Sequence, residues 1–339
     1  MESLKPLIET KRLAATIIIV VICKFILSIG LVSNILIFDH TLNGMQLLVF
    51  ILVYPILRFI SILPFPLFYG FSNIVYFFIY RVFGYRKKVV AKNLSLSFPE
   101  KSVKERKTIE KKFYKHMCDL FLEMIKTMGI SKKQLEKRYV FTNLELMQQF
   151  EGKRPVLLLG GHIANFEWMF SLNNYVKAPA FGVYQILGNK YFDRLVRNLR
   201  AKYNTTLLPT KVAIDTFVKN EEAGLNAIYG ILSDQSPQPF RAKYWSHFMG
   251  IKVPVFTGAE MLATKLDMVV LYLNIVKTKR GHYEVTFVPI TTNGADTKQY
   301  EITETYLKLI EEQIRVAPEH YLWTHRRFKH RDKVPVEFQ

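Results

Sequence analysis

The chain has 339 residues, of which 50% are hydrophobic and 14% aromatic, so it can bury a sizeable core in one large domain or two. Its net charge of +19 favours nucleic acid, an anionic membrane surface or an acidic protein as a partner. Its 2 cysteines, Cys23 and Cys118, exclude a disulfide framework and lack the spacing of metal ligands.

The N-terminal part of the chain is strongly apolar. The segment Leu13 to Phe38 is longer than the roughly 20 residues that cross a bilayer. It is too long for the apolar region of a cleaved signal peptide, so we expect a retained membrane segment. A second apolar block, Leu47 to Phe78, contains Arg58 and three prolines (Pro55, Pro64 and Pro66), which we expect to break it. We expect this block to be partly embedded, with Arg58 reaching the polar surface. Basic residues flank the apolar region on both sides, which places both flanks in the cytoplasm.

From about Arg81 the composition is that of a soluble domain. Residues 102–128 have helical periodicity, and Ser102 and Glu105 have the spacing of a capping box. Strands and helices then alternate, which predicts an α/β fold with a central sheet flanked by helices. We expect strands at 155–160, 179–184, 225–233, 268–276 and 283–289, and helices at 189–203, 255–266 and 300–316.

A candidate active site follows the first of these strands, in the stretch GGHIANFEW from Gly160 to Trp168. The two glycines allow a sharp turn at the edge of the sheet where open α/β sheets bind ligands. On one continuous helix, His162 and Glu167 would point about 140° apart. They can therefore meet only if His162 lies in the loop or at the start of the helix.

A histidine beside a carboxylate can act as a general base. The neutral imidazole of His162 would remove the proton of an alcohol that attacks an acyl carbonyl. The carboxylate would bind the other ring nitrogen, fix the tautomer and stabilise the imidazolium. The chain has no G-x-S-x-G elbow, which agrees with direct transfer and no protein nucleophile. The spacing does not favour a metal site, and a polar turn without catalytic function stays open as the alternative.

Six motifs, in order, resemble those of the lipid A biosynthesis acyltransferases, the late or secondary enzymes of the lauroyl and myristoyl type. The resemblance covers about Leu47 to Arg331. The motifs are RKKVVAKNL (86–94) with SFPE (97–100), GHIANFEW (161–168), DR (193–194), DQSP (234–237), FMG (248–250) with GAE (258–260) and LA (262–263), and PEHYLWTHRRFK (318–329).

The resemblance implies a glycerolipid-acyltransferase-like α/β fold on the cytoplasmic face of the inner membrane. Residues 1–80 would form membrane-associated helices, and residues 81–339 the acyltransferase domain. The implied reaction transfers a fatty acyl chain from acyl-acyl carrier protein to a hydroxyl of a lipid A precursor, on a 3-hydroxyacyl chain, without a cofactor or a metal. The H-x4-D/E pair of the family falls on His162 and Glu167, which makes His162 the base and Glu167 its orienting partner. The positive charge would attract both the acidic carrier protein and the anionic membrane.

Further candidate substrate-binding residues lie near the same sheet edge: Asn165, Gln185, Arg194, Arg197 and Asp234. Arg194 and Arg197 share a helix face and could clamp a phosphate, or form a solvated face paired with Asp193. Asp234 follows a buried strand, although Asp-Gln-Ser-Pro is also an ordinary turn sequence. The family usually has Tyr-Arg where this chain has Tyr184-Gln185, so a dipole replaces a cation there.

Two other functions stay open. Because of Gln185, the same catalytic pair could serve another lipid acceptor, an aminolipid or a lysophospholipid. The basic and aromatic C-terminal segment around Trp323 and Arg326 suits anionic headgroups, but would also suit a non-catalytic membrane protein that docks nucleic acid or a partner. The lack of a nucleic-acid motif and the apolar N-terminus argue against nucleic acid. We expect His325, in this segment, to be structural.

Overall fold

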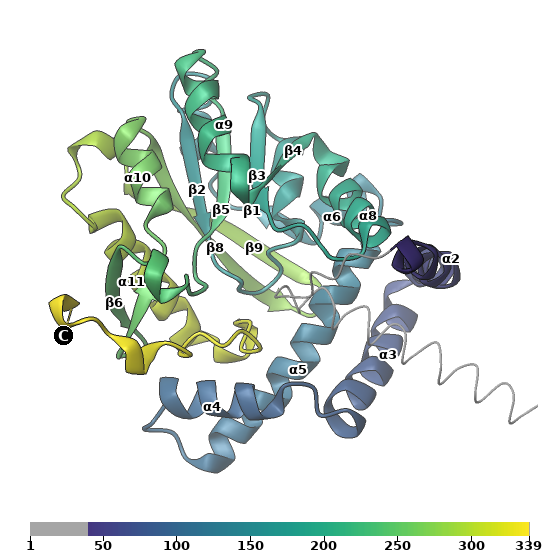
Figure 1. Ribbon diagram of the computed structural model, residues 1–339. Coiled ribbons are helices and arrows are strands. Elements are labelled where there is room, and N and C mark those ends of the chain that lie inside the picture. Colours follow the sequence, from purple (N-terminus) through teal and green to yellow (C-terminus); the bar gives the residue numbers. More distant parts are fainter. Residues whose placement is uncertain (1–39, 339) are drawn as a thin grey trace, which may run out of the picture.

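The structure, a computed structural model, describes residues 40–338 and is built around a seven-stranded sheet in the order β1-β9-β8-β2-β5-β3-β4 (Figure 1). Strand β2 pairs in parallel with β5 and β8, and β3 pairs in parallel with β5 and β4. Only β9 runs antiparallel to its neighbour β8, and the edge strand β1 follows β9 in parallel. The strands are β1 (Tyr139–Phe141), β2 (Val156–Gly160), β3 (Ala180–Tyr184), β4 (Thr205–Pro209), β5 (Ile228–Leu232), β8 (Val269–Lys279) and β9 (His282–Thr291), and a separate hairpin pairs β6 (Tyr244–Phe248) with β7 (Ile251–Val255).

Helices flank this sheet, which confirms the predicted α/β class. Helix α9 packs on β3 and β4, α10 on β2, and α11 on β8 and β9. The helices are α2 (His40–Ile62), α3 (Phe65–Tyr76), α4 (Lys87–Ser97), α5 (Val103–Lys126), α6 (Lys132–Glu136), α7 (Leu144–Gln148), α8 (Lys190–Arg200), α9 (Thr210–Glu222), α10 (Gly258–Lys265) and α11 (Glu301–Val316), with a π-helix (Phe77–Val82) after α3 and a 3-10 helix, η3 (Trp168–Asn174), after β2.

Strand β2 is the centre of the sheet. It is apolar along its whole length and buried, because the sheet is covered on both faces and β2 has a neighbour on each side. Its register with β5 pairs Gly160 with Leu232. The residues that follow these two positions therefore leave the sheet side by side, and this places the candidate site.

Helix α5 is the long helix below the sheet in Figure 1. It begins with the predicted capping box, in which Ser102 and Glu105 bond each other's backbone N–H groups. Its first half is largely exposed, whereas its second half is buried and includes charged side chains such as Asp119 and Glu123. Buried charges need partners. Asp119 pairs with Arg280 in the turn between β8 and β9, whereas Glu123 accepts from Asn165 in the loop after β2.

The helices before α5 differ in detail from the sequence-based expectation. Pro55 lies inside α2 and does not end it, since one proline removes only one intrahelical hydrogen bond. The break comes at Pro64, which precedes α3. Arg58 is exposed, and its guanidinium donates to the carbonyl of Met128 at 2.8 Å, just after α5.

The predicted membrane segment Leu13 to Phe38 lies outside the described residues. Between residues 40 and 338, no single helix has the length and apolarity to cross a bilayer. By length and composition alone, the pair formed by residues 65–82 and 87–97, bent by 88°, could do so as a broken span.

Several boundaries and elements were not predicted. The helix expected at 255–266 begins at Gly258, because residues 251–255 form β7. Strand β4 and helix α9 were missed, as was the β6–β7 hairpin. Strand β4 is half-exposed along most of its length, so it lacks the apolar run that marks β2.

Gly294 offers a test of the packing between α10 and the segment after β9. A Cβ at this position would overlap the backbone carbonyl of Ala263 and lie 2.9 Å from the carbonyl oxygen of Met268. Backbone atoms cannot turn aside as a side chain can, so Gly294→Ala should lower the free energy of unfolding by about 1–3 kcal/mol. The matched control is Gly188→Ala, where no atom lies within 4 Å of the new Cβ. Equal midpoints of the two variants in urea unfolding would show that this contact does not constrain the fold.

Candidate active site at the ends of β2 and β5

His162 and Asp234 face each other just beyond the paired ends of β2 and β5. Each lies two residues after the pair Gly160 and Leu232, so the parallel register brings them together. His162 lies in the loop between the two glycines and η3, and therefore outside a helix, as the sequence analysis expected of a histidine that meets a carboxylate. The carboxyl ends of parallel strands are where open α/β sheets form their sites.

The carboxylate of Asp234 binds His162 twice. Its Oδ1 lies 2.7 Å from Nδ1 of the imidazole, and its Oδ2 accepts the backbone N–H of His162 at 3.2 Å. Burial acts to raise the pKa of Asp234, but the charge and hydrogen bonds of His162 outweigh it, so the pKa lies below its usual value. An ionised Asp234 that accepts from Nδ1–H leaves the other nitrogen, Nε2, unprotonated and able to take a proton.

The Nε2 edge of His162 is the reactive edge. The side chain of His162 is 19% exposed, whereas that of Asp234 is 1% exposed, so a substrate reaches the histidine and not the carboxylate. The amide nitrogen of Gln235 lies 3.4 Å from Nε2, and the ring of Phe166 packs edge-on at 5.0 Å between centroids. This arrangement can accept a proton from a hydroxyl placed at Nε2.

Glu167 lies elsewhere than its predicted role requires. Its carboxylate forms a bidentate pair with Arg200 of α8, at 2.9 Å from Nε and 2.6 Å from Nη2. The carboxylate that binds His162 is that of Asp234, so the predicted contact between Glu167 and His162 is not formed. The reason is geometric: the turn at 165–167 directs Glu167 towards α8, while the strand register directs Asp234 towards His162. The pair of Glu167 with Arg200 joins the loop after β2 to α8.

Asn165 holds the loop from inside. It was expected near substrate, but its side chain is fully buried and both ends of its amide are bonded within the protein. Its nitrogen donates to Glu123 at 2.7 Å, and its oxygen accepts the backbone N–H of Trp168 at 3.0 Å. Glu123 of α5 also accepts from Tyr69 and Tyr283, and burial raises its pKa to about 7. A carboxylate with three donors fixes the loop to α5 and to β9.

The C-terminal PEHYLWTH segment holds the other side of the loop. Ile163 forms a β-bridge with Tyr321, and the backbone of Leu322 donates to the carbonyl of His162 at 3.0 Å. Ala164, the next residue after Ile163, has a φ of 52°. This left-handed conformation costs a residue with a side chain about 1–2 kcal/mol. Contacts on both sides of the turn keep this strained backbone in place.

The remaining predicted residues lie on the α8 side of the site. Gln185 follows β3 and is exposed. Arg197 pairs with Asp193 at 3.0 Å, which is the solvated-face arrangement that the sequence left open. Arg194, one turn away on α8, is exposed and forms no ion pair with any residue between 40 and 338. Among the same residues, no group of three or more His, Cys, Asp or Glu side chains could hold a metal ion.

Arg327 was missed by sequence reasoning, which assigned it to a headgroup-facing segment. Its side chain is 1% exposed and its guanidinium donates to the Ser236 hydroxyl at 2.8 Å and the Pro254 carbonyl at 3.1 Å. His325 is structural in this fold, as expected: its Nε2 accepts the backbone N–H of Ser236 at 3.3 Å. Both contacts fix the loop that carries Asp234.

Comparison with known proteins identifies the class of this α/β protein as an acyltransferase. The family described as "Bacterial lipid A biosynthesis acyltransferase" matches residues 36–330. The chain therefore belongs to the bacterial lipid A biosynthesis acyltransferase family.

Three curated relatives agree with this assignment. The lipid A biosynthesis lauroyltransferase of Escherichia coli K12 is 24% identical over 286 residues, covering 81% of this chain and 90% of that enzyme. The lipid A biosynthesis palmitoleoyltransferase of the same organism is 23% identical over 260 residues, covering 73% and 79%. A lipid A biosynthesis acyltransferase of Shigella flexneri is 23% identical over the same length, with the same coverage.

The buried histidines predict a loss of stability in acid. Burial lowers the pKa of His325 to about 3 and that of His320 to about 4, below the 6.5 of an exposed histidine. Their neutral forms stabilise the fold fully above pH 6.5, and this stability is lost as pH falls towards the folded values. His325→Gln retains an acceptor for Ser236 but does not titrate. Between pH 6.5 and 4 its free energy of unfolding should fall less steeply than that of the wild type, by up to about 1.4 kcal/mol per pH unit.

Urea unfolding at several pH values measures this difference. The carboxyl of Glu123 titrates in the same pH range, and its contribution to the free energy of unfolding changes with pH in the opposite direction. Because Glu123 is present in both proteins, this contribution cancels in the comparison. Identical pH slopes would contradict a buried, neutral His325.

Proposed function

We propose that this acyltransferase is membrane-bound and transfers a fatty acyl chain from acyl-acyl carrier protein to a hydroxyl of a lipid A precursor, on a 3-hydroxyacyl chain. The observation that carries the proposal is the pair of His162 and Asp234, with Nε2 of the histidine accessible at the sheet edge. The names of the relatives support the acceptor, since all three are lipid A biosynthesis acyltransferases.

The proposed reaction is a direct transfer. Nε2 of His162 takes the proton of the acceptor hydroxyl while its oxygen attacks the thioester carbonyl. The C–O bond of the new ester forms and the C–S bond breaks, and the imidazolium returns its proton to the departing thiolate of the carrier. Asp234 keeps Nδ1 protonated and stabilises the imidazolium, which is the task that the family pattern gave to Glu167. Glu167 then acts as a positioning residue, through Arg200.

An apolar surface on α2 and α3 supports attachment to a membrane. Leu48, Leu52, Phe59 and Leu67 are each 57–63% exposed. Apolar side chains gathered on neighbouring helices are costly in water and suit the bilayer interface. We propose that this surface rests on the cytoplasmic face of the inner membrane, with residues 1–80 as the membrane-associated part.

Helix α8 lies next to this surface, which suits an acceptor that stays in the bilayer. The ring of Phe50 on α2 lies 5.7 Å from that of Tyr191 and 5.4 Å from that of Phe192 at the start of α8. Arg194 on the same helix is a cation without a partner among the described residues and would bind a phosphate of the acceptor. Gln185 and Arg197 lie nearby and would contribute polar contacts.

Substitutions at the two carboxylates separate their roles. Asp234→Asn should lower kcat about 10²–10⁴-fold, because an amide no longer fixes the Nδ1–H tautomer, and His162→Ala should lose as much. Glu167→Gln should retain much more activity, since it touches Arg200 and not the histidine. Transfer from acyl carrier protein to a defined lipid A precursor, with purified protein, measures all three. If Glu167→Gln abolished transfer and Asp234→Asn retained it, the original assignment of Glu167 as the orienting partner would be restored.

The acceptor is tested in cells. Mass spectra of envelope lipids should show lipid A species that lack one acyl chain when the gene is removed, and restoration by the wild type but not by His162→Ala. An unchanged lipid A together with a missing aminolipid or phospholipid species would assign the enzyme to that other acceptor.

A further inference from the structure

A hollow of about 400 Å³ opens beside the loop after β5 that carries Asp234. One wall is Ser236-Pro237-Gln238, which continues the chain from Asp234, and the other includes Phe256 and the start of α10. Two cations, Arg241 and Lys243, line it. Since Gln235 approaches Nε2 of His162, the hollow begins one residue from the reactive edge of the site.

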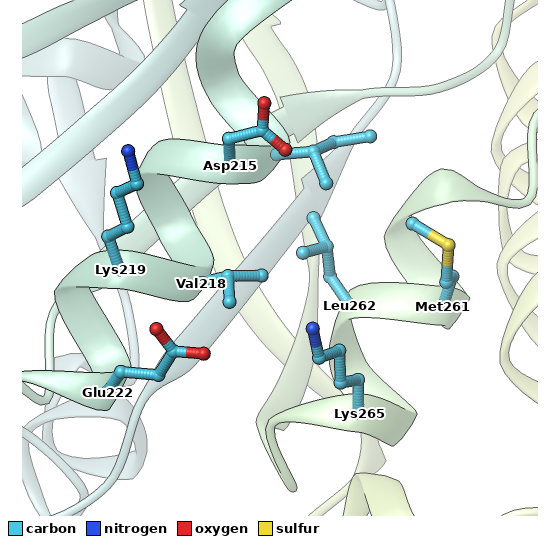
Figure 2. A pocket seen from close by; sticks show the side chains of 8 residues that line it. Asp215, Val218, Lys219, Glu222, Met261, Leu262 and Lys265 are labelled. Carbon is cyan, nitrogen blue, oxygen red and sulfur yellow. The ribbon is translucent and has the colours of Figure 1, made fainter.

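A second hollow, of about 360 Å³, continues from the first between α9 and α10. Ile214 and Met261 line both, so the two hollows adjoin; together they are named the α9–α10 groove. Figure 2 shows the second half, with Val218 and Leu262 facing each other across it. Its charged rim comes from both helices: Asp215, Lys219 and Glu222 on α9, and Lys265 on α10.

The charge of the groove is positive and uneven. Its lining has four cations (Lys219, Arg241, Lys243 and Lys265) and two acids (Asp215 and Glu222), a net charge of +2. Both acids lie in the distal half, so the charged residues that line the half next to the Asp234 loop, Arg241 and Lys243, are both cations. Arg241 and Lys243 are exposed and form no ion pair within residues 40–338. They remain available to an external anion.

A buried cation lies behind the wall of the groove. Arg327, which bonds Ser236, has no carboxylate partner among the described residues, and its Nε and Nη2 find no hydrogen-bond acceptor there. The carboxylates of Asp234 and Glu311 oppose its charge at longer range, so Arg327 adds only a partly compensated positive charge behind Ser236.

The groove also carries exposed apolar side chains. Phe256 and Met261, which line it, are each 44% exposed, and Phe240, which precedes Arg241 in the chain, is 79% exposed. Apolar side chains beside cations suit an acidic amphipathic protein surface better than a small free anion. The groove lies far from the apolar helices α2 and α3, which Figure 1 shows on the other side of the molecule.

We infer that the α9–α10 groove docks the acidic acyl carrier protein and that the prosthetic arm of the carrier reaches His162 past Ser236. The inference rests on the proposed function and adds the place where the donor binds. The acidic face of the carrier contacts Arg241 and Lys243, and the phosphate at the base of its arm lies in the cationic half of the groove. The donor therefore arrives from the aqueous side, while the acceptor arrives from the α2 and α8 side.

The double variant Arg241→Glu/Lys243→Glu tests this with the full-length protein, acyl-acyl carrier protein and a defined lipid A precursor. The expected result is a KM for the donor raised at least about tenfold, with kcat and the KM for the lipid unchanged, because exposed rim charges act on encounter and docking. Added salt should raise the wild-type KM for the donor and affect the variant less. The matched control is Lys104→Glu/Lys111→Glu, the same change of charge on the exposed part of α5.

An unchanged donor KM in the groove variant would overturn the inference, as would an equal rise in the control variant. A raised KM for the lipid with an unchanged donor KM would also overturn it, by assigning the groove to the acceptor. Failure of the wild type to use acyl-acyl carrier protein at all would contradict the proposed function itself, which separates the two outcomes.

Discussion

The hydrogen bond between Nδ1 of His162 and the carboxylate of Asp234 is the interaction on which the site depends. It joins two residues 72 positions apart in the chain. They meet because β2 and β5 are adjacent and parallel, and because Gly160 and Leu232 end the two strands in register. A one-residue shift of this register would turn the side chains to opposite faces and separate the pair. The geometry of this pair is thus set by the pairing of the buried strand β2 with the partly buried strand β5 and not by a local motif.

The rest of the structure keeps the loop after β2 in one conformation. The carboxylate of Glu123 accepts from Asn165, Arg200 pairs with Glu167, and the backbone of residues 320–322 forms hydrogen bonds with residues 162–164. The contacts come from α5, α8 and the C-terminal segment, which are far apart in sequence. Together they maintain the strained Ala164 and orient the imidazole, as a preorganised site requires.

The sequence predicted the parts of the fold that carry a strong local pattern. The capping box of α5 and the apolar run of β2 were placed within a few residues, and so was the loop position of His162. The partner of His162 was not predicted correctly. The H-x4-E spacing suggested Glu167, and no local pattern shows which strands are neighbours in the sheet. A usable signal was present, however: both His162 and Asp234 directly follow apolar strands. The half-exposed β4 and the buried Arg327 had no such signal, since tertiary contacts alone determine them.

In the proposed function the lipid acceptor approaches His162 from the side of α2 and α8, and the donor approaches it from the side of α9 and α10. The central claim is that Asp234 holds His162 in the Nδ1–H tautomer, with Nε2 unprotonated. Nitrogen NMR of histidine-labelled protein tests this most directly, with the His162 signals assigned from their absence in His162→Ala. In the neutral imidazole of the wild type the account predicts a proton on Nδ1 and none on Nε2, and in Asp234→Asn a changed tautomer. A proton on Nε2 in the wild type, or a tautomer unaffected by Asp234→Asn, would contradict it.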